Sequence, residues 1–232
     1  MKIKADLHIH SCLSPCGSLE MSPASIAKTA MERGMHVAAL TDHNTALNCK
    51  AFDSCCRDVG IFPVFGLEVT SEEEAHILCL FKTVKQAEKM GEIVYDRLPD
   101  IFNIPEKFGD QVYVDENDNI LGEVDKYLVS ATDIPLEELF DIVKTIGGMF
   151  IPAHIDKPVF SIPSQLGFLP QMEYTALETV RIPCPVETGD FTLLQDSDAH
   201  YIDDIACRFN TFEIEALSFT NIKKAIEGRK KN

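Results

Sequence analysis

Histidine and carboxylate residues recur at short, regular spacings near both ends of the chain. The sequence reads Asp6-Leu7-His8-Ile9-His10 near the start and Asp198-Ala199-His200 near the end. In an extended strand, successive side chains point to opposite faces, so residues two apart project from the same face. Neutral imidazoles and carboxylates are the ligands that Zn²⁺, Mn²⁺ and iron ions take in proteins. Both runs therefore predict metal ligands.

Residues of the same types stand at further points along the chain, at Thr41-Asp42-His43-Asn44, Glu68, His76 and Pro152-Ala153-His154. Most of them follow an apolar run. His76 is the exception, because it precedes one. A lone histidine is more often a packed or surface residue, but packing gives little reason for HxH, TDH and DxH to follow several different runs. The set as a whole therefore predicts a metal cluster.

The apolar runs alternate with segments of helical period, which is typical of parallel strands joined by crossover helices. The expected strands are Ile3–Leu7, Val37–Leu40, Phe62–Leu67, Ile77–Phe81, Phe150–Pro152, Ala176–Val180, Thr192–Gln195 and Thr211–Ile214. Eight strands suit an α/β barrel, in which catalytic groups converge at the C-terminal ends of the strands. The polar residues that follow the runs are expected to meet there.

Helix signals lie between the strands. Ser22 and Pro23 predict the start of a helix that ends near Gly34, a second helix runs from about Asp133 to Gly147, and a third covers Thr220 to Glu227. The segment Thr83 to Ser130, with a helix over Val84 to Leu98 and a hairpin-like stretch over 112–121, is read as an insertion. It is either a lid or specificity element over the site, or a structural embellishment.

Composition describes an ordinary globular protein. The chain has 232 residues, 45% of them hydrophobic, and it is expected to form a single domain over residues 1–232. It shows no signal peptide and no membrane-spanning run, so a cytoplasmic location is expected, with its eight cysteines reduced. The net charge of −16, with a basic cluster at Arg229 to Lys231, argues against duplex nucleic acid or a membrane surface as partner. Oligomeric state is left open.

The ordered set HxH, TDH, Glu, His and DxH resembles the PHP family (polymerase and histidinol phosphatase domain) over nearly the whole chain. The resemblance implies a distorted seven-stranded (β/α)7 barrel, TIM-barrel-like, with two or three divalent metal ions (Zn, Fe or Mn) at the C-terminal ends of the strands.

The resemblance also implies a ligand set. One metal would be bound by His8, His10, Glu68 and Asp198, a second by Glu68, His76 and His154, and a third by His43 and His200. The family places a further Asp or His shortly after HxH, where this chain offers Cys16, whose thiolate would favour Zn²⁺ or iron. Glu68, Asp198 and His200 are assigned to catalysis as well.

Such a cluster suits a metal-dependent phosphoesterase that hydrolyses a phosphomonoester or nucleotide, with a metal-bridging hydroxide as the attacking group. The bound cations would neutralise a small phosphorylated substrate that the acidic surface does not attract. Lys157 and Arg208 are candidates for further phosphate contacts, against the alternative of solvated surface cations. Asp6, Asp42 and Asp156 adjoin ligands and are candidates to orient imidazoles.

Two other functions remain open. Metal-dependent amidohydrolases also use HxH at the first barrel strand and a late Asp, but they usually need a mid-chain lysine or two spaced histidines, whereas this chain has Glu68. A regulatory domain that binds metal or phosphate without turnover would keep the same residues. Hydrolysis of an aryl phosphate against an amide substrate separates the two enzymes. Phosphate binding without hydrolysis across a broad panel of phosphomonoesters and nucleotides would favour the regulatory domain.

Overall fold

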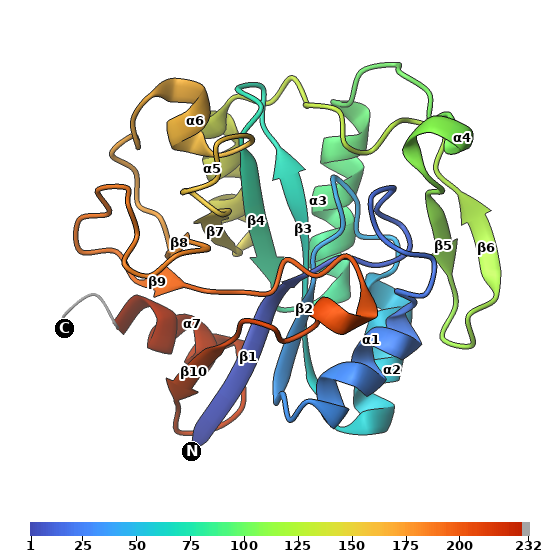
Figure 1. Ribbon diagram of the computed structural model, residues 1–232, viewed down its shortest axis with the longest axis horizontal. Coiled ribbons are helices and arrows are strands. Elements are labelled where there is room, and N and C mark those ends of the chain that lie inside the picture. The colour runs from blue at the N-terminus through green and yellow to red at the C-terminus, as the bar shows by residue number, and fades with distance from the viewer. Residues whose placement is uncertain (229–232) are drawn as a thin grey trace.

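The computed structural model describes residues 1–228, and the basic cluster Arg229 to Lys231 lies outside them. Its main sheet has the strand order β10-β1-β2-β3-β4-β7 (Figure 1). β1, β2 and β3 are parallel, whereas β10 pairs with β1, β4 with β3 and β7 with β4 in antiparallel fashion. These strands are β1 (Lys2–Ile9), β2 (Val37–Leu40), β3 (Phe62–Thr70), β4 (His76–Phe81), β7 (Met149–Pro152) and β10 (Asn210–Glu213).

A short parallel pair, β8 (Leu177–Glu178) and β9 (Leu193–Leu194), continues the curl of the sheet from β7 towards β1. On one side the Ile155 amide donates to the carbonyl of Glu178, and on the other the Asp198 amide donates to the carbonyl of His8, each at 2.9 Å. The predicted α/β class and barrel-like architecture are confirmed. The exact count of seven strand–helix units stays a prediction.

All eight expected strands are present, and so are the expected helices, observed as α1 (Pro23–Glu32), α3 (Val84–Asp96), α5 (Leu136–Ile146) and α7 (Phe219–Gly228). One crossover helix, α2 (Cys49–Val59), was not predicted. Figure 1 shows α1, α2 and α3 on the outside of the curled sheet. Shorter elements are α4 (Pro105–Phe108), α6 (Ile162–Leu166) and the 3₁₀ helix η1 (Ile202–Asp204).

Two apolar clusters hold this arrangement together. One lies between the outer face of the sheet and the helices, and it includes Ile26, Phe52 and Leu139. The other lies on the concave face and includes Val64 and Leu78, with α7 packed against it. Burial of these side chains supplies the main driving force for folding. Because side chains alternate along a strand, Glu68 on β3 and His76 on β4 share the concave face with Val64 and Leu78.

The part of the segment Thr83 to Ser130 that follows α3 packs on the loop between β2 and α2. The predicted hairpin is present as β5 (Val112–Val114) and β6 (Ile120–Glu123). Asn44 donates to the carbonyl of Leu128 at 2.7 Å, and Asn48 accepts from the Val114 amide at 2.9 Å. These buried hydrogen bonds fix the segment to the single loop between β2 and α2. A lid or specificity role stays a prediction, as does the single-domain assignment of residues 1–232.

Among residues 1–228, no helix combines the length and the apolar character needed to cross a bilayer. The cytoplasmic location stays a prediction.

Candidate metal centre

The structure brings all eight predicted histidine and carboxylate ligands into one cluster, with Glu68 at its centre. The cluster lies at the end of the curled sheet where β1, β2 and β3 finish. The Glu68 carboxylate, 1% exposed, lies within 3.5 Å of an imidazole nitrogen from each of five histidines. Its distances are 3.5 Å to His8, 3.3 Å to His10, 3.1 Å to His43, 3.0 Å to His76 and 3.1 Å to His154. Asp198 joins the cluster 3.3 Å from His8 Nε2, and its backbone carbonyl accepts a hydrogen bond from His200 Nδ1 at 2.9 Å.

His76 departs from the sequence pattern because it precedes its strand, and the direction of β4 explains why it still reaches the site. β4 runs antiparallel to β3, with Thr70 paired to His76. In an antiparallel pair the start of one strand lies beside the end of the other. His76 therefore emerges at the same end of the sheet as residues that follow parallel strands.

Hydrogen bonds at the outer nitrogens fix the tautomers of His8 and His10. Glu178 Oε1 lies 2.9 Å from His8 Nδ1, so this nitrogen carries the proton and donates a hydrogen bond to the carboxylate. Ser14 Oγ donates to Asp42 at 2.8 Å and lies 2.9 Å from His10 Nδ1, so it accepts from that ring. When the two rings are neutral, both Nε2 atoms therefore carry the lone pairs.

These two lone pairs face each other, since His8 Nε2 and His10 Nε2 are 3.0 Å apart. Asp198 Oδ1 lies 3.3 Å and 3.5 Å from the same two nitrogens. Four electron-rich groups, these three and Glu68, therefore converge without a donor between them. That arrangement fits a bound cation, which is the group that would make their approach favourable.

Other imidazole nitrogens in the cluster show the same feature. His43 Nδ1 is buried and 3.1 Å from Glu68 Oε2, yet it has no hydrogen-bond partner among the described residues. His76 Nε2 and His154 Nδ1 are also buried without a partner in residues 1–228. Buried polar atoms rarely stay unpaired in proteins, which supports a ligand role for this cluster.

The electrostatics of the cluster favour positive charge at its centre. Burial raises the pKa of Glu68, but His76, His8 and His43 outweigh it and hold that pKa well below its usual range. Burial and the neighbouring His10 lower the pKa of His200 to about 4, so its imidazole is neutral at pH 7. Burial likewise holds the pKa of His43 well below its usual value. Burial lowers the pKa of His8, but Glu178, Asp198 and Glu68 outweigh it and hold that pKa well above its usual value, so a metal ion at this ring would replace a proton.

Two of the candidate ligands lie on a strained backbone. His154 has φ 30° and Asp198 has φ 54°, in the left-handed region that residues other than glycine rarely adopt. Each such residue costs about 1–3 kcal/mol, and such conformations are typical of functional sites.

The geometry supports three groups of ligand atoms within reach of one ion, and each atom in a group lies within 4.8 Å of the others. The groups are His8, His10 and Asp198; His43, Glu68 and His76; and His10, His43 and His200. They share members with the ligand set implied by the resemblance, but His154 belongs to none of them, and Glu68 is grouped with His43 and His76. The number of ions and the residue-by-residue assignment stay predictions.

Cys16 belongs to none of these groups. The residue as a whole is exposed, although protein atoms surround much of its sulfur. Burial of the sulfur and the nearby Glu68 raise the pKa of the thiol to about 12, so without a metal it is protonated at neutral pH. Its role as a ligand stays a prediction.

The two candidate phosphate-binding residues occupy different settings. Lys157 reaches the cluster, where Nζ donates to Asp198 Oδ2, and 36% of its side chain is exposed. Arg208 donates to the backbone carbonyls of Asp196 and Ser197 at 2.9 Å, so its guanidinium holds the loop that carries Asp198. Lys157 thus has a free approach to a ligand at the site, whereas phosphate binding by Arg208 stays a prediction without support from its contacts.

Of the three aspartates expected to orient imidazoles, one does so, through Ser14. Asp42 accepts from Ser14 Oγ, which contacts His10. For Asp6 and Asp156 the expectation is wrong, because their carboxylates accept from backbone amides, those of Ser197 and Val180 among others. Both aspartates hold loops near the ligands in place.

Sequence reasoning missed Glu178. Its carboxylate is buried. It accepts one hydrogen bond from His8 Nδ1 and another from the His154 amide, at 2.7 Å. The available signal was an acidic residue inside an otherwise apolar strand candidate, since burial of a carboxylate requires a partner.

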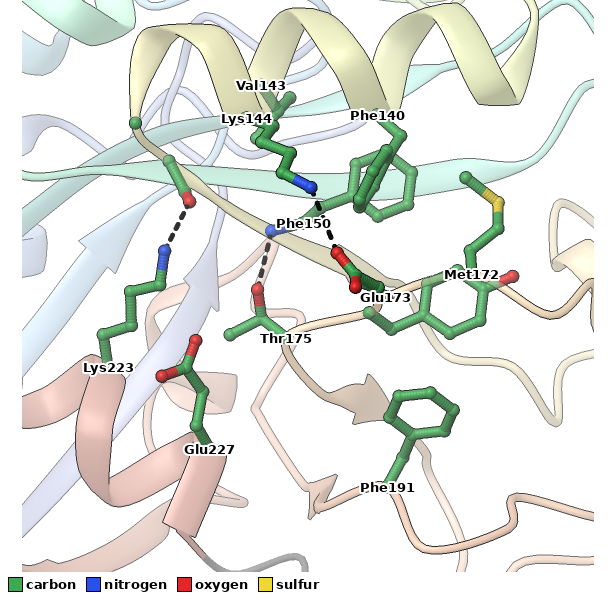
Figure 2. Close-up of a pocket in the computed structure, with 13 residues that line it drawn as sticks. Phe140, Val143, Lys144, Phe150, Met172, Glu173, Thr175, Phe191, Lys223 and Glu227 are labelled. Carbon is green, nitrogen blue, oxygen red and sulfur yellow. Dashed lines mark hydrogen bonds and ion pairs between the residues drawn. The ribbon is translucent and has the colours of Figure 1, made fainter.

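A separate cavity of about 510 Å³ opens at the opposite end of β7, between α5, α7 and the chain before β8 (Figure 2). Its two lysines are already engaged. Lys144 Nζ pairs with Glu173 at 3.0 Å, and Lys223 Nζ donates to the carbonyl of Gly148 at 3.0 Å. The cavity contains no residue of the histidine cluster.

Known structures share this fold. The lesion-specific endonuclease Q of Pyrococcus furiosus has a TM-score of 0.70 at 20% identity, over 98% of this chain and 56% of that one. A protein assigned as a metal-dependent phosphoesterase from Bifidobacterium adolescentis has a TM-score of 0.60 at 17% identity, over 97% and 96% of the two chains. An uncharacterized protein of Methanocaldococcus jannaschii is 35% identical over 88 residues, which are 34% of this chain and 50% of that protein. The match thus covers about half the length of endonuclease Q and half the length of the Methanocaldococcus jannaschii protein.

One expectation from the sequence is corrected by these comparisons. A structure of endonuclease Q in complex with a 27-mer duplex substrate, with an abasic lesion at the active site, has a TM-score of 0.69 to this chain at 19% identity, over 98% of this chain and 57% of that one. The exclusion of duplex nucleic acid on the basis of net charge is therefore wrong. Net charge sums the whole surface, whereas a substrate meets the local charge of the site.

The family assignment rests on the sequence itself. A family model for the PHP domain matches residues 6–155, which include HxH, TDH, Glu68, His76 and His154. The shared fold agrees with this match. The chain belongs to the PHP domain family.

Proposed function

We propose that the chain is a metal-dependent phosphoesterase that hydrolyses a phosphomonoester or nucleotide at the Glu68 cluster. The observation that carries the proposal is the convergence of five imidazole nitrogens on the Glu68 carboxylate, all within 3.5 Å. Divalent ions held by such a cluster would lower the pKa of a water molecule and offset the charge of a phosphate.

The residues of the chain have distinct tasks in this proposal. Glu68 and Asp198 supply the negative charge that holds cations at the centre, and the neutral His43 and His200 supply lone pairs. Glu178 keeps the proton of His8 on Nδ1, so that Nε2 faces the centre. Lys157 stands beside Asp198 and can turn its ammonium group to an entering phosphoryl oxygen.

Parallel assays of an aryl phosphate and an aryl amide on metal-loaded protein test the proposal. We expect the phosphate ester to be cleaved and the amide to stay intact. Glu68→Gln should reduce phosphate release by about 100-fold, since it removes the central charge while keeping the shape of the side chain. Glu72→Gln, which changes an exposed glutamate nearby in sequence, is the matched control and should keep full activity.

Two results would contradict the proposal. Cleavage of the amide alone would favour an amidohydrolase. Phosphate binding without hydrolysis of any phosphomonoester, nucleotide or oligonucleotide would favour a regulatory domain.

A further inference from the structure

The loop between β7 and α6 delivers three different chemical groups to the candidate metal centre within seven residues. His154 contributes an imidazole and Phe160 an aromatic ring. Lys157 contributes an ammonium group that forms an ion pair with Asp198. The imidazole and the ammonium group have a place in phosphate chemistry. Phe160 has none in the function proposed so far.

The Phe160 ring lies against a residue of the cluster. It stacks on the His76 imidazole with ring centroids 4.8 Å apart and an interplanar angle of 10°. The Phe160 carbonyl also accepts from the His76 amide at 2.9 Å. Ring and backbone together therefore fix Phe160 beside an imidazole that faces Glu68.

Phe160 is nevertheless 38% exposed, although an aromatic ring gains most from full burial. Its backbone is in the left-handed region, at φ 55°. A bulky residue at positive φ is strained, and such strain persists where the surrounding structure imposes it. The fold thus holds an aromatic ring in a costly conformation with one face on the cluster and part of its surface open to solvent.

We propose that Phe160 is a stacking platform for a planar aromatic ring on the substrate, and that the substrate is a phosphoester carrying a nucleobase. Base–aromatic stacking is tolerant of base identity, and an ammonium group on the same loop suits the attached phosphate. The inference rests on the proposed function, because it names the group that the hydrolysed phosphate ester carries. Free nucleotides and the terminal nucleotides of a nucleic acid share this chemistry.

The chain contains no tryptophan, which allows a direct optical test of stacking. Phe160→Trp places a single indole at the platform, and titration with adenosine 5′-monophosphate should quench its fluorescence. Ribose 5-phosphate, which has the same sugar and phosphate without the base, should not. Phe209→Trp is the matched control, because Phe209 is 39% exposed and stands under Lys4, at the other end of β1. Neither ligand should quench this control.

The same titration with a 5′-phosphorylated oligonucleotide, single-stranded and as a duplex, distinguishes the two sources of the base. Quenching by the oligonucleotide alone would support the platform and assign it to nucleic acid. Equal responses to the nucleotide, the oligonucleotides and ribose 5-phosphate, or no response to any of them, would overturn the inference. This readout does not depend on hydrolysis, so it can fail or succeed independently of the proposed function.

Kinetics separate a platform from a residue that only positions His76. In Phe160→Leu, the ratio of kcat/KM for adenosine 5′-monophosphate to that for ribose 5-phosphate should fall by about 5- to 100-fold, the range for loss of one base–aromatic stack. Phe160→Tyr, which keeps an aromatic face, should preserve the ratio. An equal loss on both substrates, accompanied by loss of bound metal, would show that the ring serves only to hold His76.

Discussion

At the scale of single residues, the candidate centre depends on groups that fix which nitrogen of each imidazole is free. The Glu178 carboxylate holds the proton of His8 on Nδ1, and Ser14, itself held by Asp42, does the same for His10. Without these partners each ring could rotate or change tautomer, and its lone pair would leave the centre. The outer partners are therefore as much a part of the site as the ligands.

Replacement of Glu178 by glutamine tests this view. Glu178→Gln keeps the size of the side chain but weakens its hold on the His8 proton, so we expect metal affinity to fall about 10- to 100-fold with the fold intact. Competition with a chelator measures the affinity, and circular dichroism checks the fold. Glu173→Gln, at an exposed ion pair with Lys144, is the control and should bind metal like the wild type. Unchanged affinity in Glu178→Gln would show that His8 is oriented by other contacts.

Most of the site could be predicted because its ligands follow apolar runs. His8, His43 and Glu68 each stand where an apolar run gives way to polar residues. Glu178 could not be found in this way because it lies within its run, and its partner His8 is 170 residues away in the chain. The contacts of Arg208 with backbone carbonyls leave no trace in the sequence either.

At the scale of elements, the strands were predictable from their apolar runs, but their directions were not. The antiparallel course of β4 brings His76 to the site, and nothing in the run Ile77–Phe81 indicates that course. Helix α2 was missed because its buried face is built largely from Cys49, Cys55 and Cys56, with Phe52 as its one large apolar residue. The helix also begins without a side-chain cap, because Asn48 makes no capping hydrogen bond.

The close pairing of β3 and β4 makes a prediction about Gly66, which lies opposite Leu80. A Cβ atom at this position would lie 2.5 Å from the Cys79 carbonyl oxygen, so Gly66→Ala must push the strands apart. We expect it to lower the free energy of unfolding by about 1–3 kcal/mol, measured by chemical denaturation.

Gly228→Ala is the matched control, because a Cβ there meets nothing within 4 Å and alanine favours a helix. It should leave stability unchanged or slightly raised. A Gly66→Ala protein as stable as this control would show that β3 and β4 can separate without cost.

At the scale of the whole molecule, surface charge and site charge have to be considered separately. The net charge of −16 describes the chain as a whole, but the buried cluster at the mouth of the sheet would hold cations of its own. This separation explains why composition was a poor guide to nucleic acid as a partner. The segment Thr83 to Ser130 is hydrogen-bonded to Asn44, next to His43, and the β7–α6 loop carries His154 and Lys157, so these are the places to look for substrate selection.

The central claim is that the Glu68 cluster binds divalent ions on which hydrolysis depends. The most direct measurement adds Zn²⁺, Mn²⁺ or Fe²⁺ to metal-stripped protein and follows bound metal and phosphate release from an aryl phosphate in the same samples. The account predicts that release is absent without metal, rises with occupancy and levels off at two or three ions per chain. Equal rates in stripped and loaded protein, or metal uptake unchanged in Glu68→Gln, would contradict it.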